Sequence, residues 1–191
     1  MQFHLNGVHT GDPAIAEAAP GLPGDGDAGS LPGPVDVLIV GCGPAGLTLA
    51  TQLAAFPAIH TRIVEQTAGP LLLGQADGVA CRSMEMFEAF GFADKVLSES
   101  YWVNETSFWQ PDPADATRVA RANRIQDVED GLSEMPHTIL NQARVHDFFL
   151  QAMRASPRRL VPDYSRRLIA LAVDADDPTG YPVRVTLERT D

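Results

Sequence analysis

The chain has 191 residues, with 14 Lys and Arg against 25 Asp and Glu, which gives a formal net charge of −11. This length accommodates one ordinary domain, or one domain with a tail. Hydrophobic residues make up 45% and charged residues 20%, which excludes a fully disordered chain. The acidic balance disfavours general nucleic-acid binding, because phosphate backbones attract basic surfaces.

The cysteines and the N-terminus limit the classes of site and the location. The two cysteines, Cys42 and Cys81, exclude a disulfide scaffold and a four-cysteine zinc site, although one disulfide stays open. No basic region precedes an apolar stretch at the N-terminus, and no apolar run reaches the ~18 residues of a membrane span. We expect a cytoplasmic protein with no metal site and no membrane or nucleic-acid partner.

Residues 1–34 are predicted to form a Pro/Gly-rich N-terminal arm, and residues 35–191 the folded part. The arm contains four acidic residues and no Lys or Arg. Its segment 20–27 repeats turn-forming Pro, Gly and Asp, which is typical of irregular backbone rather than of a packed element.

A strand, a helix and a second strand are predicted at the start of the folded part. The β-branched run 35–40 is typical of a strand buried on both faces. The Ala- and Leu-rich segment 45–56 predicts a helix that Pro57 ends, and 61–65 predicts the second strand. This order is a βαβ unit, whose two strands run parallel.

Apolar spacing predicts the remaining elements, which follow a loop at 66–80. Apolar residues that recur every three or four positions indicate helices, and alternation indicates strands. Gly91 stands where a glycine commonly ends a helix. The expected elements are helices at 82–90 and 92–99, strands at 102–109 and 118–125 with a turn at 111–113, a helix at 142–156, and strands at 166–173 and 181–188.

The candidate cofactor site is the glycine loop, Gly41-Cys42-Gly43-Pro44-Ala45-Gly46. It follows the first strand and opens the helix, and Glu65 lies 19 residues after Gly46, close to the ~20 expected of a dinucleotide-binding unit. Gly41 permits a tight turn, Gly43 lets the backbone approach a pyrophosphate, and Gly46 lets the helix pack against the strand. The helix N–H groups would bind the phosphates, and Glu65 a ribose diol.

Two alternatives stay open at this loop. In the first, the glycines serve only as a turn between strand and helix, and Glu65 is a surface acid. Cys42 is interpreted as a packing residue, and a redox role is the lesser alternative.

Several segments together resemble the single-component flavin-dependent aromatic hydroxylases. They are the run 35–47, then Ile63-Val64-Glu65-Gln66, then Gly74-Gln75-Ala76-Asp77-Gly78 with Arg82-Ser83-Met84-Glu85. Within this family the chain is most similar to the phenol 2-monooxygenase and 3-hydroxybenzoate 4-monooxygenase branch. Residues 1–7 and 136–147 are similar to the latter, and the resemblance covers nearly the whole chain.

The resemblance implies a fold and an activity. The fold is an α/β, Rossmann-like FAD-binding domain with a glutathione-reductase-like βαβ start, of which residues 35–191 would be the N-terminal part. FAD would be the cofactor and NADPH the transient reductant. A flavin hydroperoxide would transfer oxygen from O₂ to a phenolic aromatic substrate, a hydroxybenzoate or a phenol.

The family also carries a later Asp-Gly motif and a Gly-Asp motif, which this sequence lacks. We therefore expect a domain that is incomplete at its C-terminal end, from the N-terminal segment of a longer enzyme that is a homodimer when full length. The chain alone is expected to be inactive. A non-catalytic, truncated nucleotide-binding remnant is the alternative. An NAD-dependent dehydrogenase ranks last, because it leaves the segment 74–85 without a role.

The resemblance also implies the site residues. Asp77 would bind the substrate hydroxyl, and His137 would hold a hydroxyl or a carboxylate of the substrate. The alternatives are an Asx turn for Asp77, a structural role for His137, a solvated side chain for Arg82, and a helix-start residue that caps nothing for Gln142. The expected FAD-binding residues are Gly41, Gly43, Pro44, Ala45, Gly46, Glu65, Gln66, Arg82 and Gln142.

Overall fold

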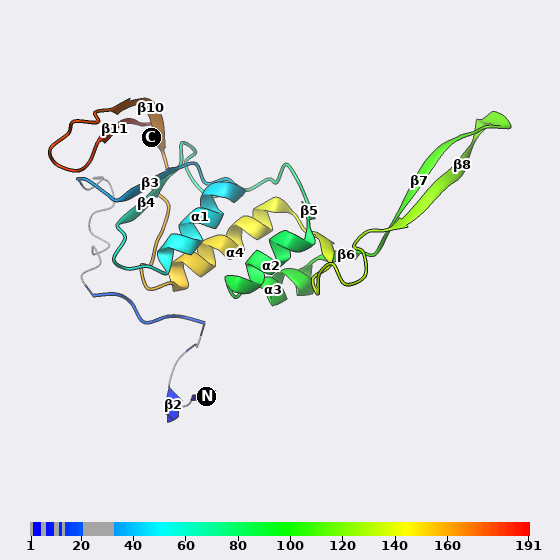
Figure 1. The fold of residues 1–191 in the computed structure, drawn as a ribbon, viewed down its shortest axis with the longest axis horizontal. Coiled ribbons are helices and arrows are strands. Elements are labelled where there is room, and N and C mark those ends of the chain that lie inside the picture. Colours follow the sequence, from blue (N-terminus) through cyan, green and yellow to red (C-terminus); the bar gives the residue numbers. More distant parts are fainter. Residues whose placement is uncertain (1, 5–6, 10–11, 13, 21–32) are drawn as a thin grey trace. The chain divides into compact units, whose positions relative to one another are not determined.

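The computed structural model describes residues 2–4, 7–9, 12, 14–20 and 33–191. Figure 1 shows the helices and strands of these residues. They divide into two compact units. The first unit comprises 1–72 and 146–191, and the second 73–145. Within the ranges given, no helix combines the length and the apolar character needed to cross a membrane.

The first unit is built on the predicted βαβ motif. Strands β3 (Val37–Val40) and β4 (Thr61–Val64) pair in parallel, and α1 (Pro44–Ala54) connects them and packs on both. Asp163 extends this sheet through a parallel bridge to Val64. The α/β fold class expected from the sequence is therefore confirmed at its central motif.

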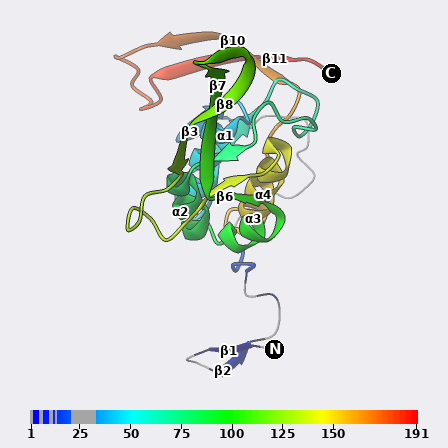
Figure 2. The same cartoon turned by 90° about the vertical axis from the view of Figure 1, so that its right-hand side faces the viewer.

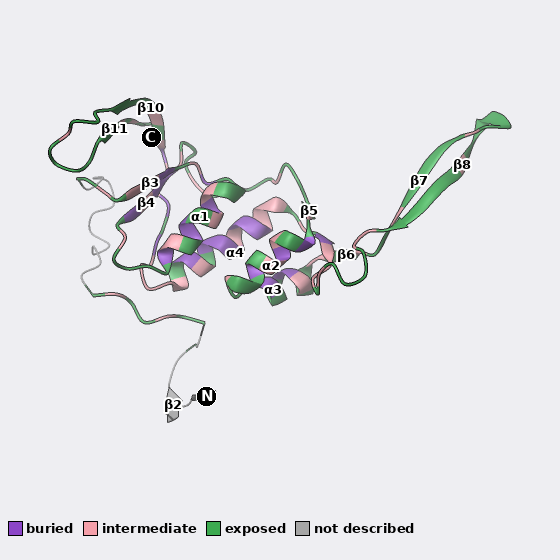
Figure 3. Cartoon of the chain, viewed as in Figure 1, coloured by how far each residue is buried: buried purple, intermediate pink, exposed green. Residues whose placement is uncertain are grey.

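Burial in this motif follows the side that α1 covers. Ile39 and Ile63 are buried, as are Leu47 and Ala50 on the helix, and Figure 3 shows the buried positions of α1. Val40 is 49% exposed, so the prediction of a strand covered on both faces is wrong at this end. Side chains alternate along a strand, and only the face of Ile39 lies against the helix.

The last two strands of the first unit form a hairpin. Strands β10 (Arg166–Val173) and β11 (Val183–Arg189) pair antiparallel, as predicted, with a bulge between Leu168 and Ala170. Helix α4 (Gln142–Ala155) has its residues from His146 onward in this unit, and its apolar stripe is buried.

The arm 1–34 contains structured segments. Strands β1 (Gln2–His4) and β2 (Gly7–His9) pair antiparallel. Further along, the Ala16 N–H donates to the Ala155 carbonyl at the end of α4, and the Arg159 guanidinium donates to the Ala16 carbonyl at 2.7 Å. The predicted turns of 20–27 lie outside the described residues, except for Pro20.

The second unit contains two helices, a small sheet and a long hairpin. Helices α2 (Cys81–Ala89) and α3 (Ala93–Glu99) occur as predicted, and Gly91, with φ +78°, follows the end of α2. Strands β5 (Gly78–Val79), β9 (His137–Ile139) and β6 (Tyr101–Val103) form a three-stranded sheet in that order. This sheet carries several of the candidate site residues.

The expected single strand at 102–109 is wrong, because two strands occupy it. After β6, strand β7 (Glu105–Asp112) leaves the sheet and pairs with β8 (Asp115–Gln126) (Figure 2). Side chains alternate in the same way along β6 and β7, so the sequence pattern could not reveal that β6 pairs with β9 and β7 with β8. The turn lies at 113–114 rather than 111–113, because Pro111 is tolerated in a two-stranded hairpin that has no further neighbour to bond.

Candidate functional site

The glycine loop has the backbone geometry that its sequence predicts. Gly41 has φ +102°, a conformation that favours glycine. A Cβ on Gly46 would lie 2.0 Å from the Gly41 carbonyl oxygen, so the close approach of helix and strand requires glycine there. A Cβ on Gly43 would meet nothing within 4 Å. The loop surface at Gly43 is therefore open.

The N-terminus of α1 is free to receive an anion. Gly43 is its N-cap, no side chain caps it, and no acidic residue lies in its first turn. Pro44 and Ala45, which begin the helix, are exposed. Unpaired N–H groups and a partial positive charge at such an end suit a phosphate. The cradle thus fits the pyrophosphate of a dinucleotide.

Glu65 is bound to this loop by its carboxylate. Its Oε2 accepts from the Cys42 N–H at 2.8 Å, and its Oε1 from the Thr67 N–H at 3.0 Å. Partial burial would raise the pKa of Glu65, but the hydrogen bonds together lower it below its ordinary value. The side chain is therefore a carboxylate at neutral pH, and a carboxylate can accept several hydrogen bonds, including those of a ribose hydroxyl.

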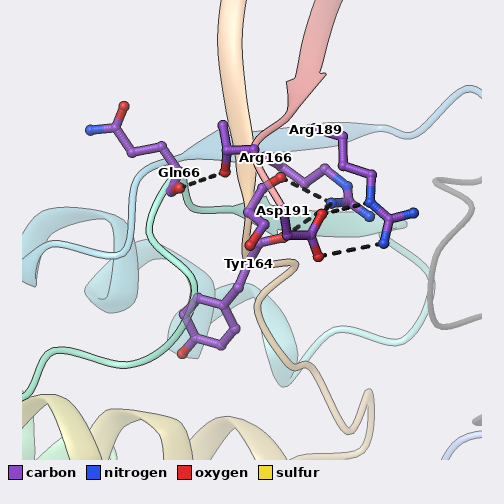
Figure 4. A network of polar contacts seen from close by, with 7 residues as sticks. Gln66, Tyr164, Arg166, Arg189 and Asp191 are labelled. Carbon is purple, nitrogen blue, oxygen red and sulfur yellow. Dashed lines mark hydrogen bonds and ion pairs between the residues drawn. The ribbon is translucent and has the colours of Figure 1, made fainter.

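The segment that follows β4 is held by residues far along the chain, which sequence spacing could not indicate. The Glu65 N–H donates to the Asp163 carbonyl at 2.9 Å, and the Glu65 carbonyl accepts from the Arg166 N–H at 2.8 Å. The Thr190 hydroxyl donates to the Gln66 carbonyl at 3.0 Å, while the Gln66 side chain points away from this network (Figure 4). One distant segment thus holds Glu65, and a second holds Gln66.

Cys42 has the properties of a packing residue. Its side chain is buried, and burial, reinforced by Glu65 and Asp163, raises the pKa of the thiol to about 12. A thiol with this pKa is protonated at neutral pH and is a poor nucleophile. Cys42 and Cys81 are both free.

In the second unit, the loop 74–78 lies against the chain at 137–142. The Gln75 N–H donates to Gln142 Oε1 at 2.9 Å, and the Asp77 carbonyl accepts from the Leu140 N–H at 2.8 Å. A Cβ on Gly74 would lie 2.9 Å from the Gln142 nitrogen, so glycine permits this approach. Gln142 thus stands at the start of α4, and its side chain anchors the loop 74–78.

Asp77 presents a carboxylate with no structural duty. The side chain is exposed, and it accepts no hydrogen bond from any residue that the structure describes. The Asx-turn alternative is therefore wrong. The pairing of β5 with β9 places Asp77 beside the strand of His137, and a Cβ on Gly78 would lie 3.4 Å from His137 Nε2.

Arg82 and His137 each have an acidic partner. Arg82, which is exposed, pairs with Glu85 at 2.8 Å one turn along α2. His137 Nδ1 lies 2.7 Å from Asp127 Oδ2. Asp127 is not predictable as a site residue, because nothing in its local sequence pattern marks it.

The structure thus groups the candidate residues within each unit. The glycine loop, Glu65 and Gln66 lie together in the first unit. In the second unit, Asp77 directly precedes β5, His137 begins β9, Gln142 begins α4, and Arg82 lies at the start of α2.

Sequence relatives point to flavin-dependent monooxygenases. The chain is 62% identical over 191 residues to the 3-hydroxybenzoate 4-monooxygenase of Comamonas testosteroni, covering all of this chain and 29% of that protein. It is 40% identical over 158 residues to the FAD-dependent monooxygenase terD of Aspergillus terreus, covering 81% of this chain and 25% of the relative. The chain therefore spans less than a third of the length of these relatives.

Solved structures share the fold. Aklavinone-11 hydroxylase, solved with FAD and aklavinone, has a TM-score of 0.62 at 21% identity and matches 83% of this chain and 30% of its own. The p-nitrophenol 4-monooxygenase PnpA of Pseudomonas putida has a TM-score of 0.63 at 15% identity. The match covers 81% of this chain and 39% of the PnpA chain. The expected Rossmann-like FAD-binding fold is confirmed.

A family model described as "FAD binding domain" matches residues 34–186. FAD is the cofactor that this description names, and the open glycine loop and the bound Glu65 carboxylate suit it. The chain belongs to the FAD-binding domain family of flavoprotein monooxygenases.

Proposed function

We propose that the full-length protein hydroxylates a phenolic aromatic acid, a hydroxybenzoate, and that this chain is its N-terminal segment. The observation that carries the proposal is the Asp77 carboxylate beside the strand of His137, which has no partner in the described part of the chain, in a chain so similar to a 3-hydroxybenzoate 4-monooxygenase. Residues 35–191 would be the N-terminal part of the FAD-binding domain, and 1–34 its arm. A cytoplasmic location and a homodimer stay predictions.

The glycine loop and Glu65 would hold the adenosine end of FAD. The open surface at Gly43 and the α1 N-terminus would receive the pyrophosphate, and Glu65 would accept from the ribose diol. Arg82, Gln142 and Gln66 are proposed as further contacts. When bound, FAD supplies the redox chemistry, with NADPH as the proposed reductant and O₂ as the oxygen source.

Asp77 and His137 would hold the substrate. The ring carbon beside a phenol hydroxyl becomes more nucleophilic as the hydroxyl proton is drawn away, which favours hydroxylation at that carbon. Asp77 suits this task because its carboxylate is exposed and has no other partner among the described residues. His137 Nε2, near the same loop, would bind a second oxygen of the ring substituents.

The test is oxygen uptake by the purified full-length protein, loaded with FAD and supplied with NADPH. We expect uptake and a dihydroxybenzoate product with 3-hydroxybenzoate, and no product with benzoate, which has no hydroxyl. FAD retained without any product from hydroxybenzoates or phenol would overturn the proposal and favour a non-catalytic nucleotide-binding protein. The same assay with NADH in place of NADPH tests the choice of reductant separately, because product formed with NADH alone would contradict only that part of the proposal.

Two substitutions separate the loop-anchoring contact of Gln142 from its proposed contact with FAD. Gln142→Glu keeps the acceptor for the Gln75 N–H but loses the Nε2 donor, whereas Gln142→Ala loses both. We expect Gln142→Glu to keep the loop in place and to weaken FAD binding by roughly tenfold, the value of one hydrogen bond to a charged or polar partner. FAD titration of both variants checks this.

Equal FAD affinity for wild type and Gln142→Glu would show that Gln142 acts only as the loop anchor. In that case Gln142→Ala alone should alter the loop, which limited proteolysis near Gln75 would detect.

A further inference from the structure

Asp127 and His137 form a close pair in the second unit. Asp127 Oδ2 lies 2.7 Å from His137 Nδ1, which is a hydrogen-bond distance. The two side chains are 18% and 31% exposed, so water competes weakly for the contact. Asp127 follows strand β8 directly, and His137 begins β9.

The carboxylate of Asp127 is held by the base of the β7–β8 hairpin. Its backbone N–H donates to the Asn104 carbonyl at 3.0 Å, and the Thr106 hydroxyl donates to its Oδ1 at 3.4 Å. Just before it, the Gln126 side chain donates to the Val128 carbonyl and to Asp130, both at 2.8 Å. These contacts all come from the chain itself, so the fold sets the position of the carboxylate.

This contact decides what the other nitrogen of His137 can do. A carboxylate at Nδ1 accepts the Nδ1–H, so Nε2 carries a lone pair in the neutral ring and an N–H in the protonated ring. Nε2 lies near Gly78, since a Cβ built on that residue would be 3.4 Å from it. Without the carboxylate, the ring is free to adopt the other tautomer or to turn about χ2.

We propose that Asp127 is a positioning residue, which fixes the orientation and the tautomer of His137 so that Nε2 meets an oxygen of the aromatic substrate. This inference rests on the proposed hydroxylation. It assigns the base of the β7–β8 hairpin a function at the substrate site. Asp127 acts through His137 and does not itself touch the substrate.

The first experiment is ¹⁵N NMR of the full-length protein labelled at histidine, without substrate. We expect the wild-type His137 to be the Nδ1–H tautomer, and Asp127→Asn to shift it toward Nε2–H, because an amide can donate to Nδ1. An Nε2–H tautomer in the wild type, or an unchanged tautomer in Asp127→Asn, overturns the proposal. Neither measurement depends on activity.

The second experiment is steady-state kinetics with 3-hydroxybenzoate. Partners that orient a metal-binding histidine are worth roughly 10–100-fold. For the same kind of contact at His137 we expect the KM of Asp127→Asn to rise while FAD content is unchanged. Asp127→Glu, which restores a carboxylate, should recover part of the loss. A shifted tautomer with an unchanged KM overturns the link to the substrate.

Glu129→Gln is the matched control, since it removes an exposed acid two residues from Asp127 whose side chain makes no hydrogen bond with the described residues. In this control, the His137 tautomer and the KM should equal those of the wild type. A KM raised as far as in Asp127→Asn would mean that Asp127 has only a structural role. If the wild type forms no product, the proposed function fails, while the NMR result still decides the positioning of His137.

Discussion

Gly46→Ala should destabilise the protein and abolish FAD binding. The added Cβ would lie 2.0 Å from the Gly41 carbonyl oxygen, and a backbone oxygen cannot rotate away as a side chain can. Overpacking typically costs about 1–3 kcal/mol, and we expect the upper end or more here. The helix would have to move from the strand, which separates the N–H groups of α1 from the loop. Thermal unfolding and FAD titration of the full-length protein measure the two effects.

Gly43→Ala is the matched control within the same loop. Its Cβ would meet nothing within 4 Å, and the backbone angles, φ −71° and ψ 175°, are allowed for alanine. We expect a loss of stability of at most about 1 kcal/mol, from a poorer N-cap. FAD affinity should still fall, because the methyl group occupies the proposed pyrophosphate surface.

The two variants therefore separate packing from binding. Gly46→Ala should lower both the melting temperature of the apoprotein and the FAD affinity, whereas Gly43→Ala should lower chiefly the affinity. Undiminished FAD affinity in Gly43→Ala would place the pyrophosphate elsewhere. An unchanged melting temperature in Gly46→Ala would mean that the loop relaxes at little cost.

The glycine loop was predictable because its geometry is local. The turn at Gly41, the close approach at Gly46 and the distance to Glu65 follow from one strand, one helix and the next strand. Local spacing does not show which distant segment holds Glu65 in place, so the contacts from Asp163 and Arg166 appear only in the structure.

The second unit was less predictable, because its site depends on strand pairing between distant segments. The pairing of 78–79 with 138–139 sets Asp77 beside β9, and no periodicity specifies it. Alternation also continued across Asn104 and concealed the point at which the chain leaves one sheet for the hairpin. Asp127 was missed for the same reason, since its proposed role depends on a hydrogen bond to His137, ten residues away in another strand.

Asp77→Asn should lower the kcat for hydroxylation about a hundredfold or more. Asparagine can still hydrogen-bond a phenol, but its amide has no negative charge and cannot accept the proton. Proton transfer to a positioned base is worth about 10²–10⁴-fold. The Asp77 side chain makes no hydrogen bond with the described residues, so stability should change by no more than about 0.5 kcal/mol. FAD content should equal that of the wild type. Product formation, measured separately from NADPH oxidation, checks this.

The exposed position of Asp77 makes the result interpretable. Since the carboxylate holds no turn and no strand, a lower kcat cannot be assigned to a loop that has lost its structure. Glu88→Gln, which removes another exposed acid from the same unit, controls for the change in charge and should hydroxylate at the wild-type rate. Wild-type kcat and KM in Asp77→Asn would remove Asp77 from the mechanism and leave His137 as the remaining candidate for contact with the substrate.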